Sequence, residues 1–374
     1  MKIIYIGSPP LLTRGASAIH IFKMCSAFSQ LGHRVTLYIP PYDRSGDIFS
    51  YYGVEQNFDI KTIVSPKNFL RQIIHGLCCV FYFATKNPRA DIVITRNIIF
   101  TFFSTVFLRV PTIYDAHHPL VNKIAEFFFN TFKDSRSLIR FTTNSQGLAD
   151  YYLKMGLPAG KLRVLHNGVE LDKYSKSKTK TQARKITNLQ AGKKIVLYSG
   201  NIYKGRGIDL LIDAACDLKD VLFLVLGGEQ KDIDYYENIV KTKKVENFKF
   251  LGFVDHKEVI NYLYSSDVLV MPYGGGMTIK SGTVASDFTS PIKLFEYMAS
   301  KRVIVASKIN SVLEILEDGR NAVLVEIDDL DSLKKGLRLA LNNSSNSLKL
   351  ADQAYKDVKK YTWKQRASKM LENV

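Results

Sequence analysis

The segment Ser290–Ala299 reads Ser-Pro-Ile-Lys-Leu-Phe-Glu-Tyr-Met-Ala and joins a Gly/Ser-rich stretch to an expected helix. A helix N-terminus has backbone amides without intrahelical partners and a partial positive charge, so it can hold a phosphate group. Lys293 would add a point charge, and Glu296 could accept hydrogen bonds from hydroxyl groups beside the phosphate. Phosphate and hydroxyl groups together indicate a nucleotide or nucleotide sugar. The alternative is an amphipathic helix that begins with Pro291 for structural reasons alone.

A second cationic segment, Tyr198–Asp209, joins an expected strand to an expected helix through three glycines. Glycines leave backbone amides accessible, and the guanidinium of Arg206 offers a planar set of donors that matches phosphate oxygens. We favour Arg206 over Lys204 as the ligand because Arg206 lies closer to the helix start. The pattern indicates diphosphate binding, although surface solubility would explain either cation alone.

Two segments of the first half also follow expected strands. Gly15 lies in a turn of small residues, where the backbone could approach a ligand closely, but the full Gly-x-Gly-x-x-Gly spacing is missing and a purely structural turn fits equally well. His117 and His118 follow the strand at 110–116, where an imidazole could bind a sugar hydroxyl or transfer a proton. A pair of solvent-facing histidines is the alternative. Adjacent histidines rarely chelate one ion and no carboxylate cluster accompanies them, so no metal site is predicted.

Strand-like apolar runs alternate with helix-like amphipathic stretches along the chain, which is typical of parallel sheets covered by helices on both faces. For 374 residues we predict an α/β chain of two doubly wound, Rossmann-like domains facing each other across a cleft, with ligands beyond the carboxyl ends of the strands. The boundary is expected near residues 170–190, where Ser175–Thr181 is polar and low in complexity. The expected strands include Ile3–Ile6, Val35–Ile39, Ile92–Thr95, Thr112–Tyr114, Ile195–Tyr198, Leu222–Leu226, Val268–Met271 and Val303–Ala306.

Composition narrows the class of protein. With 46% hydrophobic and 23% charged residues the chain is globular. Its four cysteines lack metal-ligand spacing, which favours a reducing, cytoplasmic compartment over a disulfide framework. The N-terminal apolar run is too short for a signal peptide, and the longest apolar runs fall short of the roughly 20 residues that span a bilayer. No transmembrane helix is predicted.

Positive charge is concentrated in the first half. Residues 1–190 contain 25 Lys and Arg and 11 Asp and Glu, a net charge of +14, while residues 191–374 contain 27 and 24, a net charge of +3. Such a field attracts phosphate-rich partners, among them anionic lipids. Aromatic and basic residues mix in Phe69–His75 and Phe127–Lys133, as in helices at a membrane interface, although core helices with a basic edge would look similar. Because no nucleic-acid motif accompanies the charge, we expect an anionic membrane surface and not nucleic acid as the partner.

Taken in order, these segments resemble the family-four retaining glycosyltransferases of the GT-B fold over nearly the whole chain. Leu165–Glu170, with its Asn-Gly-Val sequence, is similar to the segment that precedes the interdomain linker in that family. Tyr361–Lys364 is similar to the start of the last helix, which in the family returns to the first domain. The resemblance therefore implies an acceptor-binding domain at 1–170, a linker and nucleotide-sugar-binding domain at 171–360, and a returning helix at 361–374.

The resemblance also implies roles for individual residues. The glycine-rich loop would lie near the donor diphosphate and the acceptor, His117 would face the donor sugar, and Arg206 would bind the diphosphate. Glu296 would bind ribose hydroxyls, and the residues after the strand near 250 would lie beside the nucleobase. The expected catalytic residues are His117, Arg206 and Lys293, and the expected donor-binding residues are Gly15, Ala16, Ser17, Asn201, Phe253, Val254, Ser290, Ile292 and Glu296.

Two residues depart from the family pattern. Phe288 stands where the first glutamate of the paired-glutamate motif belongs, and Asn201 stands where an arginine is common. The sugar preference of better-known members therefore does not transfer to this chain. We expect Lys293 to compensate by contacting phosphate or an acidic sugar, and the loop Gly274–Ser286 to close over the substrate.

The expected activity is metal-independent, cofactor-free transfer of a hexosyl group from a UDP or GDP sugar, with retention at the anomeric carbon. The acceptor would be a saccharide or a lipid-linked molecule of polysaccharide biosynthesis, and the chain would work in the cytoplasm as a peripheral protein on the inner membrane. Two alternatives are a GT-B nucleotide-sugar epimerase and a non-catalytic, basic, membrane-peripheral protein whose donor site has decayed. A nicotinamide dehydrogenase is disfavoured by the incomplete glycine fingerprint.

Overall fold

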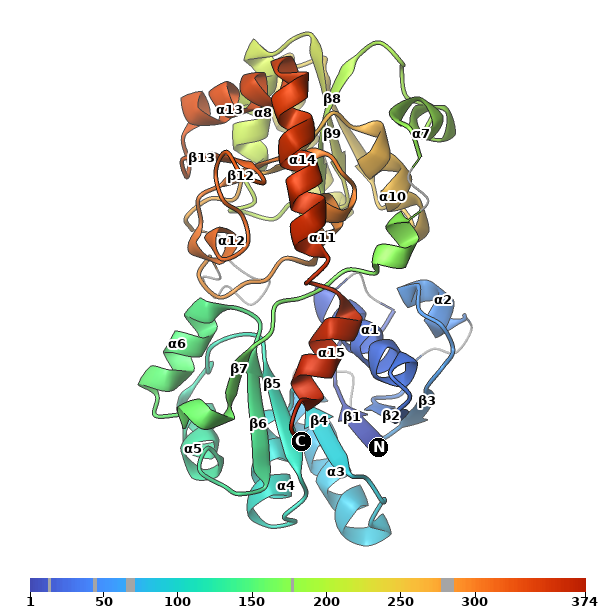
Figure 1. Cartoon of the computed structure of the whole chain (residues 1–374), viewed down its shortest axis with the longest axis vertical. Helices are drawn as coiled ribbons and strands as arrows, with labels where there is room; N and C mark the ends of the chain where they lie inside the picture. The colour runs from blue at the N-terminus through green and yellow to red at the C-terminus, as the bar shows by residue number, and fades with distance from the viewer. Residues whose placement is uncertain (13–14, 43–45, 65–70, 176–177, 277–285) are drawn as a thin grey trace. The chain divides into compact units, whose positions relative to one another are not determined.

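The computed structural model describes residues 1–12, 15–42, 46–64, 71–175, 178–276 and 286–374. These residues form two compact units: unit 1 comprises Met1–Asn167 and Trp363–Val374, and unit 2 comprises Gly168–Thr362. Each unit is a parallel sheet with helices packed on it (Figure 1). Both sheets confirm the predicted α/β fold of two Rossmann-like domains.

Unit 1 contains a sheet of seven parallel strands in the order β3-β2-β1-β4-β5-β6-β7. The order reverses between β1 and β4, and Ile3 of β1 pairs with Val35 of β2 on one side and with Ile92 of β4 on the other. Ile3, Val35 and Ile92 are buried, because helices cover both faces of a parallel sheet. The strands are β1 (Lys2–Ile6), β2 (Arg34–Ile39), β3 (Asp59–Thr62), β4 (Ile92–Thr95), β5 (Thr112–Ala116), β6 (Leu138–Thr143) and β7 (Leu162–Val164).

The last helix of the chain belongs to unit 1, where it packs against α1 (Figure 1). Arg140 of β6 holds this helix, α15, by donating hydrogen bonds to the backbone carbonyls of Lys369, Met370 and Glu372. The helices of unit 1 are α1 (Ala16–Gln30), α2 (Ile48–Tyr52), α3 (Arg71–Lys86), α4 (Ile98–Val106), α5 (Lys123–Phe132), α6 (Gln146–Lys154), the 3-10 turn η1 (Ala159–Lys161) and α15 (Trp363–Leu371).

Unit 2 contains a sheet of six parallel strands in the order β10-β9-β8-β11-β12-β13, with its reversal between β8 and β11. Its strands are β8 (Lys194–Ser199), β9 (Val221–Leu226), β10 (Phe248–Gly252), β11 (Val268–Met271), β12 (Val303–Ser307) and β13 (Val323–Val325). Its helices are η2 (Leu171–Tyr174), α7 (Lys180–Ile186), α8 (Ile208–Asp217), α9 (Gln230–Thr242), α10 (His256–Ser265), α11 (Ile292–Ala299), α12 (Asn310–Leu313), α13 (Leu330–Asn342) and α14 (Ser344–Val358). Within the described part of the chain, no helix combines the length and apolar character needed to cross a bilayer.

Candidate functional site

The reversal of strand order in unit 2 brings together two loops that follow β8 and β11. Ligands of open α/β sheets bind at such a reversal, beyond the carboxyl ends of the strands. The two loops are joined by a hydrogen bond of 3.0 Å from the amide of Gly274 to the carbonyl of Gly205. Gly207, at the start of α8, has φ of +72°, and a Cβ atom there would lie 1.7 Å from the carbonyl oxygen of Pro272. Glycine is therefore required at this position.

Two cationic side chains meet a cluster of tyrosines at this point. The guanidinium of Arg206 donates a hydrogen bond of 2.6 Å to the hydroxyl of Tyr203, and its carbon lies 4.8 Å from the ring centroid of Tyr273. The Nζ atom of Lys293 lies 3.7 Å from the centroid of Tyr198 and 5.3 Å from that of Tyr273. Arg206 and Lys293 thus share the ring of Tyr273, although 87 positions separate them in the sequence.

The side-chain amine of Lys293 lies in an environment that is unfavourable for its positive charge. Its Nζ atom is buried and has no hydrogen-bond partner among the residues that the structure describes. Burial lowers the pKa of this amine well below its usual value; the charge of Arg206 lowers it further, and Glu296 opposes the shift. Two neighbouring cations, one of them without a partner, form a place where a bound anion would remove an unfavourable interaction. Gly200 makes room for the amine, since a Cβ atom there would lie 2.8 Å from Nζ.

Helix α11 carries Lys293 into this site. The helix begins at Ile292 with Pro291 as its N-cap, and Ser290 before it is buried. Lys293 therefore belongs to the first turn, whose backbone amides lack intrahelical acceptors. The hydroxyl of Tyr297 accepts a hydrogen bond of 2.8 Å from the amide of Ser199, which ties α11 to the end of β8. The contacts of Lys293 and Tyr297 thus place α11 beside the end of β8, and the ring of Tyr273 after β11 joins Lys293 to Arg206. Ser290, Ile292 and Glu296 belong to the same segment, before and within α11.

The remaining expected donor-binding residues of unit 2 lie around this centre. Asn201 is exposed, and its carbonyl accepts a hydrogen bond of 2.5 Å from the hydroxyl of Tyr198. Phe253 and Val254 follow the edge strand β10, and the side chain of Phe253 is 44% exposed. Lys204 is exposed. Most of the loop expected to close over the substrate, residues 277–285, lies outside the described residues.

Unit 1 contains a buried polar network centred on Asp115 of β5. One carboxylate oxygen of Asp115 lies 3.0 Å from Nε2 of His20 and 3.0 Å from Nε2 of His117. The other accepts a hydrogen bond of 2.7 Å from the hydroxyl of Thr142 and one of 2.9 Å from the guanidinium of Arg366 in α15. Because an ionised carboxylate only accepts hydrogen bonds, both imidazoles must carry their proton on Nε2.

The charges of this network are settled by its partners. Burial alone would raise the pKa of Asp115, but the charge of Arg366 and the bonds from the two imidazoles hold it well below its usual value. Burial lowers the pKa of His117 well below its usual value, with Arg96 acting in the same direction, and burial lowers the pKa of His20 to about 4. At neutral pH the network thus contains a carboxylate, a guanidinium and two neutral imidazoles.

The same side chains have the composition of a metal site, since ligand atoms of His20, Asp115 and His117 lie within 4.8 Å of one another. We interpret them as a hydrogen-bonded network. The guanidinium of Arg366 already neutralises Asp115 with its fixed positive charge, and a divalent cation at the shared oxygen would be repelled by it.

The glycine-rich loop leads into α1 of unit 1, where the strand order reverses between β1 and β4. Gly15 is the N-cap of α1, and Ala16 and Ser17 form its first turn. Arg96, which follows β4, donates a hydrogen bond of 3.1 Å to the hydroxyl of Ser17. His118, in contrast, is exposed and hydrogen-bonds the carbonyl of Pro119 next to it.

Sequence reasoning missed several residues of both units. The tyrosines around the cations lie near strand ends, where the apolar pattern predicts core positions and nothing indicates a binding site. His20 lies within an expected helix and Asp115 within an expected strand, so neither position indicates a role, and nothing near Arg366 in the sequence points to Asp115. The missed residues are His20, Arg96, Asp115, Thr142, Tyr198, Tyr203, Tyr273, Tyr297 and Arg366.

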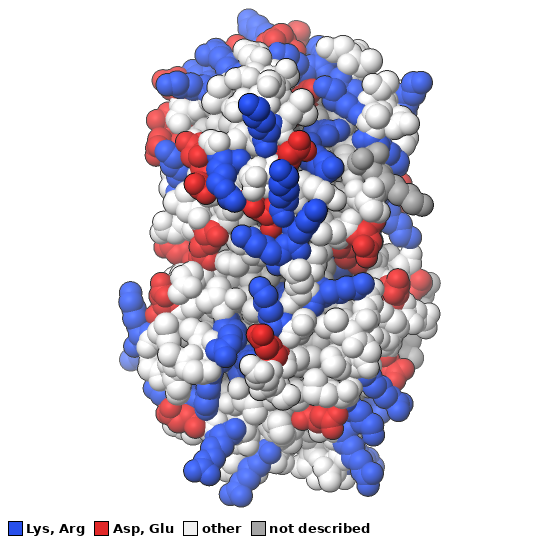
Figure 2. Space-filling model, viewed as in Figure 1, with Lys and Arg blue, Asp and Glu red and all other residues white. Residues whose placement is uncertain are grey.

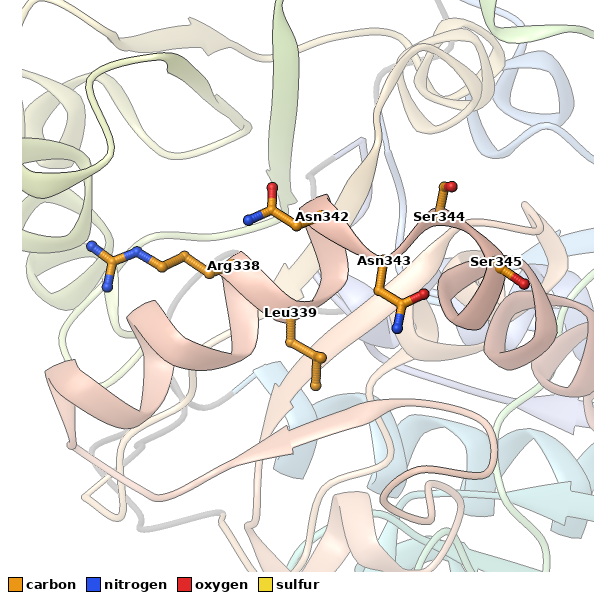
Figure 3. Close-up of a pocket in the computed structure, with 6 residues that line it drawn as sticks. All are labelled: Arg338, Leu339, Asn342, Asn343, Ser344 and Ser345. Carbon is orange, nitrogen blue, oxygen red and sulfur yellow. The ribbon is translucent and has the colours of Figure 1, made fainter.

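A surface hollow of about 620 Å³ lies where α13 passes into α14 (Figure 3). The hollow is lined by Arg338, Leu339, Asn342, Asn343, Ser344 and Ser345. All six residues are exposed, and Arg338 is the only charged residue among them. The hollow lacks the buried, unpaired charge that distinguishes the ends of β8 and β11.

Two Rossmann-like units, one with a cation pair at its strand reversal, define a protein of the GT-B class. Residues 17–173 match the family described as Glycosyltransferase Family 4, and residues 179–357 match the family described as Glycosyl transferases group 1. The two matches together span most of the chain. The chain therefore belongs to the family-four type of GT-B glycosyltransferase, and the predicted resemblance is confirmed.

Individual relatives are distant. The chain is 21% identical over 253 residues to the uncharacterized glycosyltransferase MJ1069 of Methanocaldococcus jannaschii, an alignment that covers 65% of this chain and 60% of the relative. It is 27% identical over 180 residues to an uncharacterized 41.2 kDa protein in the cps region of Klebsiella pneumoniae, covering 48% of this chain and 45% of the relative. The matched part thus spans about half the length of these relatives.

Solved structures share the fold over the whole chain. Anabaena HepE, crystallised in complex with UDP, superimposes with a TM-score of 0.77 at 15% identity, covering 100% of both chains. WaaG, a glycosyltransferase involved in lipopolysaccharide biosynthesis, superimposes with a TM-score of 0.72 at 14% identity, again covering 100% of both chains. At such identities the comparison establishes the architecture.

Proposed function

We propose that this chain transfers a hexosyl group from a UDP or GDP sugar to an acceptor hydroxyl, with retention at the anomeric carbon. The observation that carries the proposal is the buried amine of Lys293 at the first turn of α11, which lies near Arg206 and has no hydrogen-bond partner in the described part of the chain. An anion with two adjacent phosphates would satisfy both cations and the helix amides. HepE, which shares the fold, has been crystallised with UDP and with UDP-glucose, and this supports a nucleotide sugar as the donor.

The chemistry needs stabilisation of the leaving group more than a nucleophile. As the bond between the anomeric carbon and the diphosphate breaks, negative charge grows on the diphosphate, and Arg206, Lys293 and the amides of Ile292 and Lys293 would stabilise it. Pro291 has no amide to offer. The acceptor oxygen forms its bond to the anomeric carbon on the face that the diphosphate leaves, and its proton passes to the departing phosphate. Because fixed cations stabilise the charge, we propose that the transfer needs neither a divalent metal nor an organic cofactor.

The other parts of the donor are assigned to the residues around the cation pair. Glu296, one helical turn from Lys293, would accept hydrogen bonds from ribose hydroxyls. Phe253 and Val254 follow β10, two strands from β8, which corresponds to about 10 Å and leaves room for a ribose between diphosphate and base. Asn201 would complete the donor contacts.

In unit 1, His117 would bind a hydroxyl group of the sugar, and the start of α1 would bind the acceptor. Gly15, Ala16 and Ser17 form that start, and Arg96 beside Ser17 adds a cation suited to a phosphate-bearing acceptor. We propose a saccharide or lipid-linked acceptor of a cell-envelope polysaccharide. The relative from Klebsiella is a protein in the cps region, and a further relative is named a teichuronic acid biosynthesis glycosyltransferase of Bacillus subtilis.

We further propose that unit 1 works in the cytoplasm, attached to the anionic surface of the inner membrane. Ile73, Leu77 and Phe81 recur at every fourth position of α3 and are 44%, 44% and 70% exposed. Phe107 after α4 and Phe127 in α5 are also exposed, and α4 packs against both α3 and α5. Lys and Arg side chains surround the end of unit 1 where α3 and α4 lie, interspersed with Asp and Glu (Figure 2). Exposed apolar side chains flanked by basic ones suit an interface with acidic lipid.

Calorimetric titration with UDP and GDP tests the donor site. The variants Arg206→Gln and Lys293→Met should each weaken binding of the preferred nucleotide at least 10-fold, because each loses a charge-assisted hydrogen bond. The matched control Lys204→Met removes an exposed cation of the same loop and should bind as the unaltered chain does. Equal affinities in all four proteins would refute the assignment.

Product analysis then separates the proposal from its two rivals. The chain should be incubated with a nucleotide sugar that it binds and with a mixture of envelope saccharides. It should release the nucleotide and form a product whose anomeric configuration, measured by proton NMR, is the same as that of the donor sugar. Conversion of the sugar in the absence of acceptor would identify an epimerase. A chain that binds acidic vesicles but neither nucleotide would be the non-catalytic, membrane-peripheral protein.

A further inference from the structure

The carboxylate of Asp115 is fully buried and accepts four hydrogen bonds, two at each oxygen. A buried carboxylate is unfavourable unless its charge is paired and its lone pairs are all used. Only one of its partners carries a fixed positive charge, and that partner, Arg366, comes from α15 at the far end of the chain. The donor and acceptor chemistry described above gives Arg366 no direct part.

We propose that Arg366 is a positioning residue that acts through Asp115 to hold His117 in one tautomer, with its proton on Nε2 and its Nδ1 atom free to accept a hydrogen bond. The effect on catalysis rests on the proposed function. The tautomer of His117 does not depend on it. It makes α15 a working part of the site, in addition to its packing role.

The geometry around His117 supports this assignment. Its Nε2 atom bonds Asp115 at 3.0 Å, while its Nδ1 atom has, among the residues that the structure describes, a single long contact of 3.4 Å with the side-chain nitrogen of Asn144. A ligand that approaches Nδ1 must therefore donate a hydrogen bond, as a sugar hydroxyl does and a carboxylate does not. The network thus selects a hydroxyl group and rejects an acidic group at this position.

The geometry around Arg366 shows why its charge matters. The Nη2 atom bonds Asp115 at 2.9 Å, whereas Nε and Nη1 are buried without a hydrogen-bond partner among the described residues. The guanidinium is therefore stabilised mainly by Asp115, and Asp115 mainly by the guanidinium. The ring of Trp363, one turn earlier in α15, packs edge-on against His20 at 5.3 Å and closes the network from the same helix.

The competing interpretation is that Arg366 only fastens α15 to the sheet. Arg140 provides a matched control, because it is a buried arginine that holds the same helix through backbone carbonyls without touching Asp115. The variants to compare are Arg366→Met, Arg366→Lys, Asp115→Asn and Arg140→Met, each first checked for folding by circular dichroism and thermal unfolding.

Long-range proton–nitrogen NMR of protein labelled with nitrogen-15 in its seven histidines reports the tautomer of each ring without any substrate. We expect His117 in the unaltered chain and in Arg140→Met to be neutral with its proton on Nε2 between pH 6 and 8. In Arg366→Met and Asp115→Asn the signal should become a mixture of tautomers, and Arg366→Lys should restore the single form. If Arg366→Met does not fold, Asp115→Asn and Arg366→Lys still decide the question.

Kinetics supply the second measurement. Arg366→Met should lower kcat about 10- to 100-fold, because a displaced or wrongly protonated His117 no longer meets the sugar hydroxyl in the productive geometry, with KM for the donor changed less than threefold. Arg140→Met should keep kcat within threefold, and Arg366→Lys should recover most of the loss. A single Nε2 tautomer in folded Arg366→Met would overturn the role of Arg366, and a single Nε2 tautomer in Asp115→Asn would overturn the role of Asp115 through which Arg366 is proposed to act. A chain without transferase activity that still shows the expected tautomers would overturn the proposed function and leave the positioning role intact.

Discussion

Replacement of Lys293 by methionine should stabilise unit 2 and weaken donor binding at the same time. The buried Nζ atom has no hydrogen-bond partner among the described residues, and its contact with the ring of Tyr198 at 3.7 Å returns only part of the lost hydration. A buried polar group without a partner costs about 1–3 kcal/mol and more when charged, against about 0.5–2 kcal/mol from a cation–π contact. A methionine of similar length can pack on the same tyrosine rings without that cost.

We expect Lys293→Met to raise the free energy of unfolding of unit 2 by about 1–2 kcal/mol at neutral pH. For a unit of this size, residues 168–362, the corresponding rise in Tm is about 2–8 °C. The proposed bond from Lys293 to a phosphate oxygen is charge-assisted and would contribute about 1.5–3 kcal/mol, so the substitution should increase the Kd for the nucleotide about 10- to 150-fold. Stability and affinity thus change in opposite directions.

The pH dependence follows from the lowered pKa of Lys293. The unfolded chain has a lysine pKa of about 10.4, so below that pH it binds more protons at this position than the folded chain does. The folded state of the unaltered chain therefore gains stability as pH rises toward 10, and Lys293→Met lacks this slope. The stability advantage of the variant should be largest near pH 6 and should shrink as pH approaches 10.

Differential scanning calorimetry at pH 6, 7, 8 and 9, together with nucleotide titrations, measures both effects. The control Lys204→Met alters an exposed cation of the neighbouring loop and should change stability by no more than about 0.5 kcal/mol. A lower Tm for Lys293→Met at neutral pH, or a stability advantage that grows with pH, would show that the amine is not an unfavourable buried charge and would refute the reasoning.

Three further predictions concern the scaffold and the surface. Gly207→Ala should destabilise unit 2 by more than about 2 kcal/mol in urea unfolding, because the new Cβ atom would combine a φ of +72° with a clash against Pro272. The control Gly276→Ala, with open space around it, should be nearly neutral. Equal urea midpoints of unfolding for the two variants would contradict this prediction. Tyr297→Phe should cost about 1–3 kcal/mol, because it leaves the buried amide of Ser199 without its acceptor, and unchanged thermal stability would count against the tie between α11 and β8. Phe81→Glu should abolish sedimentation with vesicles of acidic lipid, and the binding of the unaltered chain should weaken as salt rises, whereas salt-insensitive binding or none at all would argue against a membrane interface.

The sheets could be predicted from the sequence because their strands are buried on both faces. Runs such as Ile3–Ile6 and Val268–Met271 are apolar at every position, and that local pattern suffices to identify a strand of a covered parallel sheet. Arg206 and Lys293 could be named one at a time, because each stands where a strand passes into a helix. The three glycines of the loop after β8 were likewise visible in the sequence, whereas the left-handed conformation of Gly207 and its close approach to Pro272 were not.

Which of these groups meet, and what surrounds them, is set by the packing of elements that lie far apart in the chain. Local sequence predicts core or loop positions for three tyrosines that in the structure surround the two cations, namely Tyr198, Tyr203 and Tyr273. Asp115 and Arg366 lie 251 positions apart, so no local periodicity relates them. Amphipathic patterns encode which face of an element is buried, whereas the partner of a buried charge depends on how distant elements pack. For that reason the strands and their end loops could be predicted from local sequence, whereas the pairing of Arg366 with the carboxylate beside His117 emerged only from the packing of α15 in unit 1.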